Sequence, residues 1–498
     1  MTKPIQGLLC LLVLSVLLGA FAGCGGGQEN PPADPASSTE EGSDAGSDAG
    51  ADPDPDVRPP VRELPEADYE NYSFRILMRN NSGHWADMFV DESSGDAVDN
   101  AVFLRNEAVA DRYNIQFELI TSSSDNDDSD GIPVILSGTD AYDLVAPHGR
   151  RCITYAMSGC CVDWYDLPYL NLTYDWWAQG ARESFTFNDM LLFMTGDLSH
   201  LSVAASYVLM FNKDILTANE IPFPYDDVKA GSWTFEKMSE IALQCARDLD
   251  GDNVCSLDSM ADVLGYATFP WGGTYCSFFA SGSRILSRDE NGMPILTIAS
   301  ETAYDALTDF FTLVTGFYCH LDANDSNAKV TSAMIGNRIV FHDSPLNGVA
   351  QNYRKTDLNY GIVPFPKTAE VENYASHVAG AYNVFLIPST SPDTARTAAI
   401  LEALCQEGSR SVIPVYYDSV VSTKSMRDEQ SYEMLPIISA SRLYDFGYYD
   451  CELPGMSNLM EPLAKNDRSA ASFYSIYNGR LNEAQEHLRE LVALYSEY

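Results

Sequence analysis

The sequence is poor in basic residues. Its 498 residues include 30 lysines and arginines against 71 aspartates and glutamates, which gives a formal net charge of −41. Such a negative surface repels nucleic acid and anionic lipid headgroups, and it argues against both as partners. It also argues against a strongly anionic ligand, unless a local basic patch overrides the global field.

Signals of several enzyme classes are missing as well. The sequence contains no GxSxG, P-loop or HExxH motif and no Ser-His-Asp order typical of a catalytic triad. Its seven histidines are scattered singly and no CxxC pair occurs, so a zinc site is not indicated. Acidic pairs are abundant and none stands out, which leaves a glycosidase-like carboxylate pair open as an alternative.

Eleven cysteines are spread along the chain, and Cys160 and Cys161 are adjacent. Apart from Cys10 and Cys24, nine cysteines remain, which is an odd number. We interpret them as mostly buried free thiols, with one or two disulfides as the alternative.

The sequence has only one long apolar run, and it lies near the N-terminus. Lys3 precedes the stretch from Leu8 to Ala22, which is the length of a signal-peptide core and shorter than the ~20 residues that span a bilayer. Small residues then lead into Cys24, whose thiol can be acylated once it becomes the N-terminus. The segment resembles a bacterial lipobox and predicts a signal peptide over residues 1–23 and lipidation of Cys24.

The residues after Cys24 fit a tether, which we predict over residues 24–69. Up to Val57 they are mainly glycine, proline, serine, alanine and acidic residues, with no basic residue among them. Without large apolar side chains, nothing offsets the entropy of ordering this segment, so it is expected to be disordered. A lipid with two or more chains anchors stably, so we expect the protein on the extracellular face of the cell membrane.

The remaining chain alternates between short apolar runs and helical patterns. Strands are predicted over 74–78, 115–120, 142–146, 361–366 and 382–387, and a helix capped by Asp99 runs to about Tyr113. Further helices are predicted over 235–247 with Thr234 as the N-cap, from Ser391-Pro392 with proline at the first position, and at 481–495 with one apolar face. This alternation predicts an α/β fold with a largely parallel sheet, which binds ligands beyond the carboxyl ends of its strands. The roughly 440 residues after the tether are too many for one core, so two or three domains are expected.

Several short motifs occur in a characteristic order. They are Tyr142-Asp143-Leu144-Val145, Asp166-Leu167-Pro168-Tyr169-Leu170, Gly196-Asp197-Leu198, Met210-Phe211-Asn212-Lys213, Trp233-Thr234 and Tyr360-Gly361-Ile362-Val363-Pro364-Phe365-Pro366. By their order and spacing, the chain from about residue 70 to 498 resembles the extracellular solute-binding proteins, family 1 type, of carbohydrate ABC transporters.

The resemblance implies a two-lobed, periplasmic-binding-protein-like α/β fold of type II with a hinge between the lobes. It places the first lobe over 70–203 and 372–425, and the second over 204–371 and 426–498. It further implies a monomeric, non-enzymatic lipoprotein that captures a sugar or oligosaccharide in the interlobe cleft and delivers it to an ABC permease. The alternatives are a surface glycoside hydrolase or lyase, and a lipoprotein that captures glycan without transport.

Sugar recognition needs flat apolar faces and planar polar side chains, which directs attention to residues near the predicted strand ends. Trp271 lies in a glycine-rich loop, where cleft stacking and loop packing are both open. The candidate ligand-binding residues are Trp271, Tyr275, His148, Arg150, Asp197, His342, Asp343 and Asn383. A solvated loop or a satisfied core position is the alternative for each polar member.

The segment from Asp248 to Ser259 resembles an EF-hand-type calcium loop, in which alternate positions supply oxygen ligands. The candidate metal ligands are Asp248, Asp250, Asp252, Val254, Ser256 and Asp258. Position 12 is Ser259 rather than an acid, so Asp258 or Asp262 has to complete the shell. Structural calcium is one interpretation, an acidic solvated loop is the other, and no further cofactor is expected.

Overall fold

The computed structural model describes residues 64–496, apart from 91–94, 125–126, 260, 317–318, 322–326 and 422–428. The predicted signal peptide, Cys24 and most of the tether lie outside the described residues. Among the residues that are described, no helix is long and apolar enough to cross a membrane.

The first lobe is built on a parallel sheet with the strand order β2-β1-β3 (Ile115–Thr121, Tyr72–Met78 and Leu144–Ala146). Helix α2 (Ala97–Tyr113) joins β1 to β2, which is the crossover that parallel neighbours require. The apolar runs of β1 and β3 are buried, because helices cover such a sheet on both faces.

Two helices of this lobe begin differently from the prediction. The carboxylate of Asp96, not that of Asp99, caps α2. Helix α14 (Thr394–Glu407) is capped by Asp393, so Pro392 precedes the helix instead of opening it. In both cases an aspartate close to the predicted start accepts the free backbone N–H groups.

The segment 382–387, predicted as a strand, extends the first sheet through single antiparallel bridges. Leu386 forms a bridge with Val145 of β3, and Phe385 forms one with Met194. The sheet edge that carries the carboxyl ends of β1 and β3 therefore continues to residues near Gly196.

The second lobe contains a mixed five-stranded sheet. Its order is β10-β4-β9-β5-β8 (Tyr360–Val363, Tyr207–Asn212, Ile339–Pro345, Leu264–Thr268 and Cys319–Leu321). Strand β5 runs parallel to β8 and β9, whereas β4 is antiparallel to β9 and β10. The carboxyl ends of β5 and β9 consequently lie at the edge where β4 begins.

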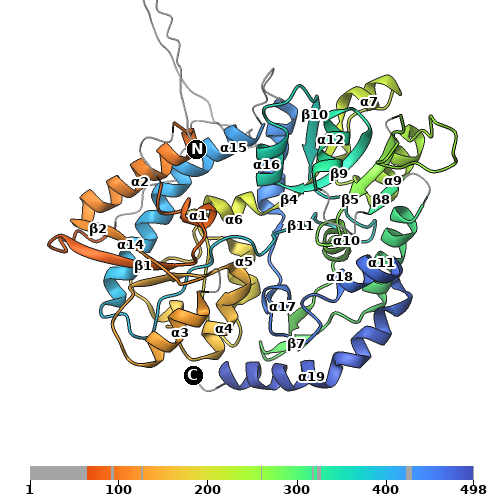
Figure 1. The fold of residues 1–498 in the computed structure, drawn as a ribbon. Helices are drawn as coiled ribbons and strands as arrows, with labels where there is room; N and C mark the ends of the chain where they lie inside the picture. Colours follow the sequence, from red (N-terminus) through yellow and green to blue (C-terminus); the bar gives the residue numbers. More distant parts are fainter. Residues whose placement is uncertain are drawn as a thin grey trace, which may run out of the picture. The chain divides into compact units, whose positions relative to one another are not determined.

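Helices surround both sheets (Figure 1). The remaining helices are α1 (Ser82–Trp85), α3 (Asp128–Leu136), α4 (Cys152–Met157), α5 (Gln179–Phe185), α6 (His200–Ala204), α7 (Lys213–Ala218), α8 (Tyr225–Lys229), α9 (Phe235–Cys245), α10 (Gly273–Ala280), α11 (Glu301–Val314), α12 (Asn327–Ile335), α13 (Leu346–Asn352), α15 (Ile413–Val421), α16 (Glu429–Ala440), α17 (Phe446–Tyr449), α18 (Met460–Pro462) and α19 (Phe473–Leu494). As predicted, Thr234 caps α9.

Three chain segments run side by side between the lobes, and we call them the central segments (205–207, 376–379 and 441–443). Ser206, just before β4, forms a bridge with Val378. Strand β11 (Ser376–His377) pairs in parallel with β12 (Arg442–Leu443). Figure 1 shows β11 between the two lobes, as expected of a hinge.

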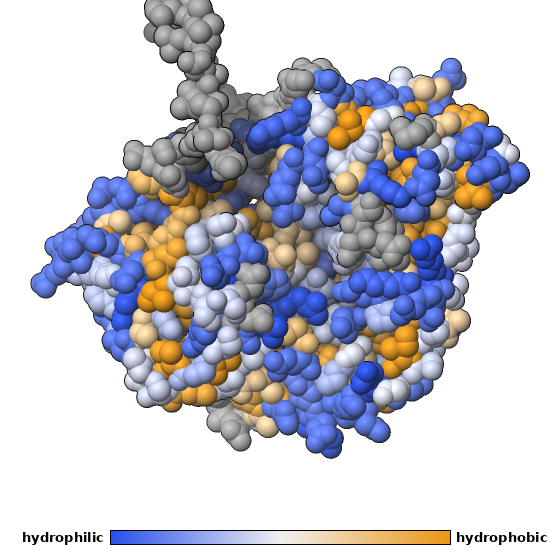
Figure 2. Space-filling view, in the orientation of Figure 1, coloured by the Kyte–Doolittle hydropathy of each residue, from blue (hydrophilic) through white to orange (hydrophobic). Residues whose placement is uncertain are grey.

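The amphipathic C-terminal helix predicted from the sequence is α19. It packs against β7 (Pro294–Leu296) of the second lobe, which pairs with β6 (Leu286–Arg288), and against α4 of the first lobe. In Figure 1 it runs along the edge below both lobes. The face seen in Figure 2 is mostly hydrophilic, with separate apolar patches, as the acidic composition suggests.

All nine cysteines of the described residues carry free thiols, and only Cys451 is partly exposed. Burial raises the pKa of the Cys319 thiol to about 12 and that of Cys160 to about 11. Such thiols stay protonated near neutral pH and behave as small apolar side chains.

Candidate ligand-binding site

Two predicted residues of the first lobe follow the carboxyl end of β3. His148 and Arg150 lie in a short turn whose backbone is fixed from both sides. The backbone of His148 forms a bridge with Asn383, and the N–H of Gly149 donates to the carbonyl of Tyr382 at 2.8 Å. This turn lies at the sheet edge that faces the central segments.

The second lobe contributes Asp343, which lies within β9 near its carboxyl end rather than after the strand. One carboxylate oxygen accepts a hydrogen bond from the Tyr266 hydroxyl at 2.7 Å. The other oxygen is buried and has no hydrogen-bond partner in the described part of the chain. Gly272 is required beside it, because a Cβ at this position would lie 2.3 Å from that oxygen and 3.1 Å from the Tyr207 ring.

Trp271 precedes this glycine and is partly exposed. Its ring stacks on Phe269, with the centroids 5.1 Å apart and the planes 4° apart. The ammonium of Lys465 lies 5.8 Å from the same ring and also pairs with Glu461 at 3.2 Å. The predicted loop tryptophan is thus an oriented aromatic plate, packed on one face by Phe269.

A row of three rings connects Arg150 of the first lobe to Asp343 of the second. The Arg150 guanidinium lies 4.9 Å from the centroid of Tyr448. The Tyr448 ring is 4.6 Å from His377, and His377 is 5.7 Å from Tyr207, the neighbour of Asp343. We call Arg150, Trp271 and Asp343 with this ring row (Tyr207, His377 and Tyr448) the interlobe site.

Two histidines at the site are neutral near pH 7. Burial, and then the nearby positive charges of Arg79, His84 and Arg150, lower the pKa of His148 to about 3. Burial and Arg150 lower the pKa of His377 to about 3 as well. Both rings therefore offer hydrogen-bonding nitrogens without charge.

Two other predicted residues lie behind the site. Tyr275 on α10 is 1% exposed, its hydroxyl donates to the carbonyl of Ser457 at 3.1 Å, and its ring lies 5.7 Å from His377. The His342 ring is hydrogen bonded to the carbonyl of Ala267 at 2.9 Å, and burial lowers its pKa. Both side chains hold the surrounding structure in place.

The last two predicted ligand residues have partners elsewhere. Asn383 donates to the carbonyl of His84 at 2.6 Å and to the carboxylate of Asp87 at 2.9 Å, which ties segment 382–387 to α1. Asp197 is buried, which raises its pKa to about 6 against the opposing effect of Arg442. The structure therefore groups Asp197 with Arg442 and not with Trp271.

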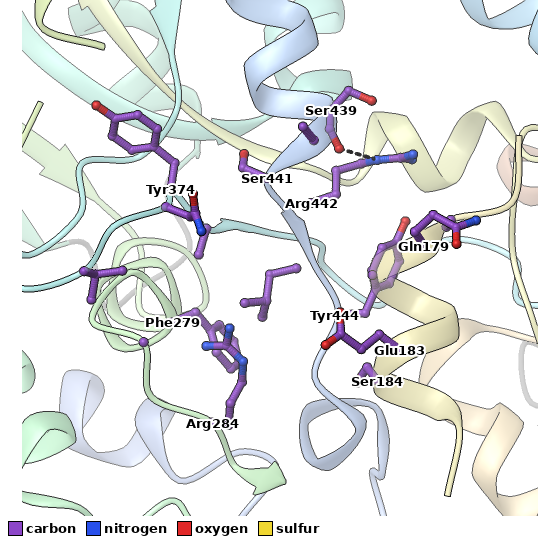
Figure 3. Close-up of a pocket in the computed structure, with 18 of the residues that line it drawn as sticks. Gln179, Glu183, Ser184, Phe279, Arg284, Tyr374, Ser439, Ser441, Arg442 and Tyr444 are labelled. Atoms are coloured by element: carbon purple, nitrogen blue, oxygen red, sulfur yellow. Dashed lines mark hydrogen bonds between the residues drawn. The ribbon is translucent and has the colours of Figure 1, made fainter. Parts of the chain in front are cut away.

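Beside β12, residues of both lobes enclose a cavity of about 990 Å³. Figure 3 shows Arg284 on one side and Glu183 of α5 on the other, with Tyr444 and Arg442 on the same side as Glu183. Burial lowers the pKa of Arg284, and the carboxylates of Asp445 and Glu183 oppose that shift. None of the eight ligand-binding residues predicted from the sequence lines this cavity.

The ring row was not predicted. Tyr207, His377 and Tyr448 lie in or beside apolar runs, and the pattern there predicts that an aromatic side chain belongs to the hydrophobic core. Their special position arises because three distant segments meet at the hinge. Tyr207 and His377 lie close to predicted lobe boundaries, whereas Tyr448 does not.

The acidic loop brings three carboxylates together. Oxygens of Asp248, Asp250 and Asp262 all lie within 4.8 Å of one another. Asp262 is buried and accepts the backbone N–H of Leu249 at 3.1 Å. Asp258 instead pairs with Lys329 at 2.7 Å. Of the two residues considered for completing the shell, Asp262 is the one that the fold directs to the loop.

The remaining predicted metal ligands are engaged within the loop. Asp252 accepts the N–H of Val254 at 2.8 Å, and the Ser256 hydroxyl accepts the N–H of Ser259 at 3.2 Å. Asn253 has a φ of +65°, the left-handed conformation needed at the turn. The three clustered carboxylates are hard oxygen ligands of the type that calcium prefers.

No family model and no curated protein matches the chain, but solved structures do. UgpB from Mycobacterium tuberculosis in complex with glycerophosphocholine has a TM-score of 0.54 at 14% identity, covering 84% of this chain and 98% of its own. A cyclo/maltodextrin-binding protein with maltotetraose has a TM-score of 0.53 at 14% identity, covering 85% and 98%. The ABC substrate-binding protein Lmo0181 from Listeria monocytogenes, with cycloalternan, has a TM-score of 0.51 at 14% identity, covering 84% and 99%.

At this low identity the likeness establishes the fold. The two-lobed α/β architecture with a hinge, predicted from the sequence, is confirmed. The chain has the fold of the solute-binding proteins of ABC transporters, over nearly the whole length of each of these structures.

Proposed function

We propose that this protein captures a sugar or oligosaccharide between its lobes and delivers it to the permease of an ABC transporter. The observation that carries the proposal is the ring row beside the central segments, which has Arg150 of the first lobe at one end and Asp343 of the second at the other, with Trp271 next to the glycine that packs on Asp343. Hinge bending closes such lobes around a ligand, and the similar structures with maltotetraose and cycloalternan support a sugar.

The residues of the interlobe site match the chemistry of a sugar. The flat ring of Trp271 suits the C–H face of a pyranose. The unpartnered oxygen of Asp343 suits a hydroxyl group, since a buried acceptor without a partner is costly. Recognition of this kind requires no chemical step, so the protein acts as a binding protein.

The proposal is tested by a thermal-shift screen against a sugar panel, with product analysis of each mixture. We expect the melting temperature to rise with the concentration of one class of sugar while the sugar stays intact, because a ligand that binds only the folded state stabilises it. Consumption of a glycan would favour the hydrolase or lyase. A flat response to every sugar would overturn the proposal.

The lipid anchor belongs to the same proposal. Acylated Cys24 and the acidic tether would keep a monomeric receptor at the outer face of the membrane, within reach of a permease. In a bacterial host, the wild-type chain is expected in the membrane fraction and a Cys24→Ser variant in the medium. Equal release of both proteins would contradict the anchor.

We also propose that the acidic loop binds one structural calcium ion through Asp248, Asp250 and Asp262. Calcium titration by calorimetry should give one site, and Asp262→Asn should weaken it strongly because a buried charged ligand is lost. Asp258→Asn is the matched control, since Asp258 pairs with Lys329. An equal loss in both variants, or no calcium binding by the wild type, would contradict this assignment.

A further inference from the structure

The first-lobe side of the interlobe site is basic, although the chain as a whole has a formal charge of −41. Arg150 is the central group. The positive charges of Arg79, Arg150 and Arg151 and the ring of His84 all act on the neighbouring His148. The overall negative charge argues against an anionic ligand unless a local basic patch overrides it, and these residues form such a patch.

Arg150 is not neutralised by the protein. Among the described residues no carboxylate lies within the 4.0 Å of an ion pair from its guanidinium, and its Nε is buried without a hydrogen-bond partner. The adjacent Arg151, in contrast, pairs with Asp128 at 3.7 Å. Two consecutive arginines therefore differ in whether their charge has a partner.

Three acidic groups that share buried neighbours with Arg150 have other partners. Glu461 pairs with Lys465 at 3.2 Å, and Asp450 pairs with His487 at 2.7 Å. Glu452 accepts a hydrogen bond from the Thr154 hydroxyl at 3.3 Å. Among the described residues, the Arg150 guanidinium therefore has no counter-ion, whereas its neighbour Arg151 has Asp128.

The side chain of Arg150 is also held in a fixed orientation. Its stem runs against Gly380, where a Cβ would lie 2.4 Å from the Arg150 Cγ, and its guanidinium lies over the Tyr448 ring. Stacking occupies a face of the guanidinium plane and leaves its edge, which carries the N–H donors, for other partners. This edge matches the two oxygens of an anion in bidentate geometry.

Closure over a neutral sugar would leave this charge poorly compensated. When the lobes close, water leaves the site and an unpaired guanidinium loses solvation, which is costly. An anion on the ligand would restore a partner at the moment of closure. The fixed orientation of the guanidinium edge and the missing counter-charge thus both indicate a ligand that carries an anionic group.

Building on the proposed function, we infer that the captured sugar carries an anionic group, which the edge of the Arg150 guanidinium binds, while Trp271 and Asp343 hold the uncharged part. The shared chemistry is an oxyanion on a sugar, either the carboxylate of a uronic acid or a phosphate or sulfate ester.

The test compares matched ligands by calorimetry on the mature protein. Each acidic sugar is paired with its neutral counterpart: galacturonate oligomers with galactose oligomers, a phosphorylated sugar with the free sugar, and a sulfated sugar with its parent. We expect one acidic member to bind at least about tenfold more tightly than its neutral partner, as a hydrogen-bonded charge suggests. The preferred pair identifies the oxyanion.

Two variants make the test specific. Arg150→Gln should remove the preference for the acidic sugar, whereas Arg151→Gln, with the same change in net charge, should retain it. Circular dichroism verifies that both variants fold. Equal or tighter binding of the neutral member by the wild type, or equal loss in both variants, would overturn the inference. Failure to bind any sugar would instead overturn the proposed function.

Discussion

The interlobe site and the cavity beside β12 both lie where the lobes meet, but they treat charge differently. The cavity is spacious and places charges of both signs on its walls, with Glu183 facing Arg284. The interlobe site contains a guanidinium without a counter-charge and a carboxylate oxygen of Asp343 without a hydrogen-bond partner. The cavity also contains buried polar atoms without hydrogen-bond partners among the described residues, Nη1 of Arg442 and the hydroxyl of Tyr444, so the two regions differ in the balance of their charges and not in whether their polar groups are satisfied.

The largest expected effect tests the tight fit at Gly272. A Gly272→Ala variant places a methyl group 2.3 Å from the Asp343 carboxylate, so Asp343 or the Trp271 loop must move. We expect sugar affinity to fall by about 100-fold, which corresponds to ~2.7 kcal/mol, in a calorimetric titration.

The control for this substitution is Gly479→Ala in α19, where no atom lies within 4 Å of the new Cβ. Alanine favours a helix interior over glycine, so affinity should stay unchanged and the melting temperature should not fall. Equal losses in both variants would place Gly272 outside the binding site.

A smaller effect is expected from removing the aromatic ring of Tyr448, on which the Arg150 guanidinium stacks. Tyr448→Leu removes the ring that orients the guanidinium but retains an apolar side chain. We expect a loss of sugar affinity of about tenfold, close to the value of a partly desolvated cation–π contact. Tyr474→Leu on the exposed face of α19 is the control; a loss of affinity there would contradict a local effect.

The ring row also predicts a pH dependence of stability. The pKa of His377 is lowered from 6.5 to about 3, so the folded state resists its protonation. Its contribution to stability is complete above pH ~6.5 and is lost as the pH falls towards 3. His377→Phe should reduce the slope of unfolding free energy against pH in this range by up to about 1.4 kcal/mol per pH unit.

Urea unfolding from pH 7 to pH 4 measures this slope. The other buried histidines, including His148, still titrate in the variant, so part of the acid sensitivity should remain. An unchanged slope would show that His377 is accessible to protons in the folded protein.

The smallest effect is expected in the cavity. Asn373→Ala and Glu183→Gln alter two exposed residues of its lining without disturbing the interlobe site. Each variant should change sugar affinity by less than about twofold, within the ~0.5 kcal/mol typical of surface substitutions. A tenfold loss in either variant would indicate that the sugar binds in the cavity and not at the interlobe site.

The sequence predicted what depends on local pattern. The apolar runs that became β1, β3 and β10 and the cap of α9 at Thr234 were identified, because each is encoded within a few neighbouring residues. The start of α2 was misplaced by a few residues, since Asp96 and Asp99 are both suitable caps and local chemistry does not choose between them.

The candidate site was predicted only in part, for a physical reason. Arg150 and Asp343 were named as candidates because the sequence places polar residues after apolar runs, where ligands bind in α/β folds. His377 was missed because its significance comes from pairing of its short segment with β12, which lies about 65 residues further along the chain. Asp262 was one of two candidates for completing the acidic loop, because the motif alone does not specify the turn that brings it to Asp248 and Asp250.

The three central segments have a mechanical consequence. Three connections that lie side by side restrict sliding and twisting of the lobes more than a single connection would, and they favour hinge bending. The empty and the ligand-bound protein then differ mainly in the angle between the lobes. A partner protein that contacts both lobes at once can therefore distinguish the ligand-bound protein from the empty one.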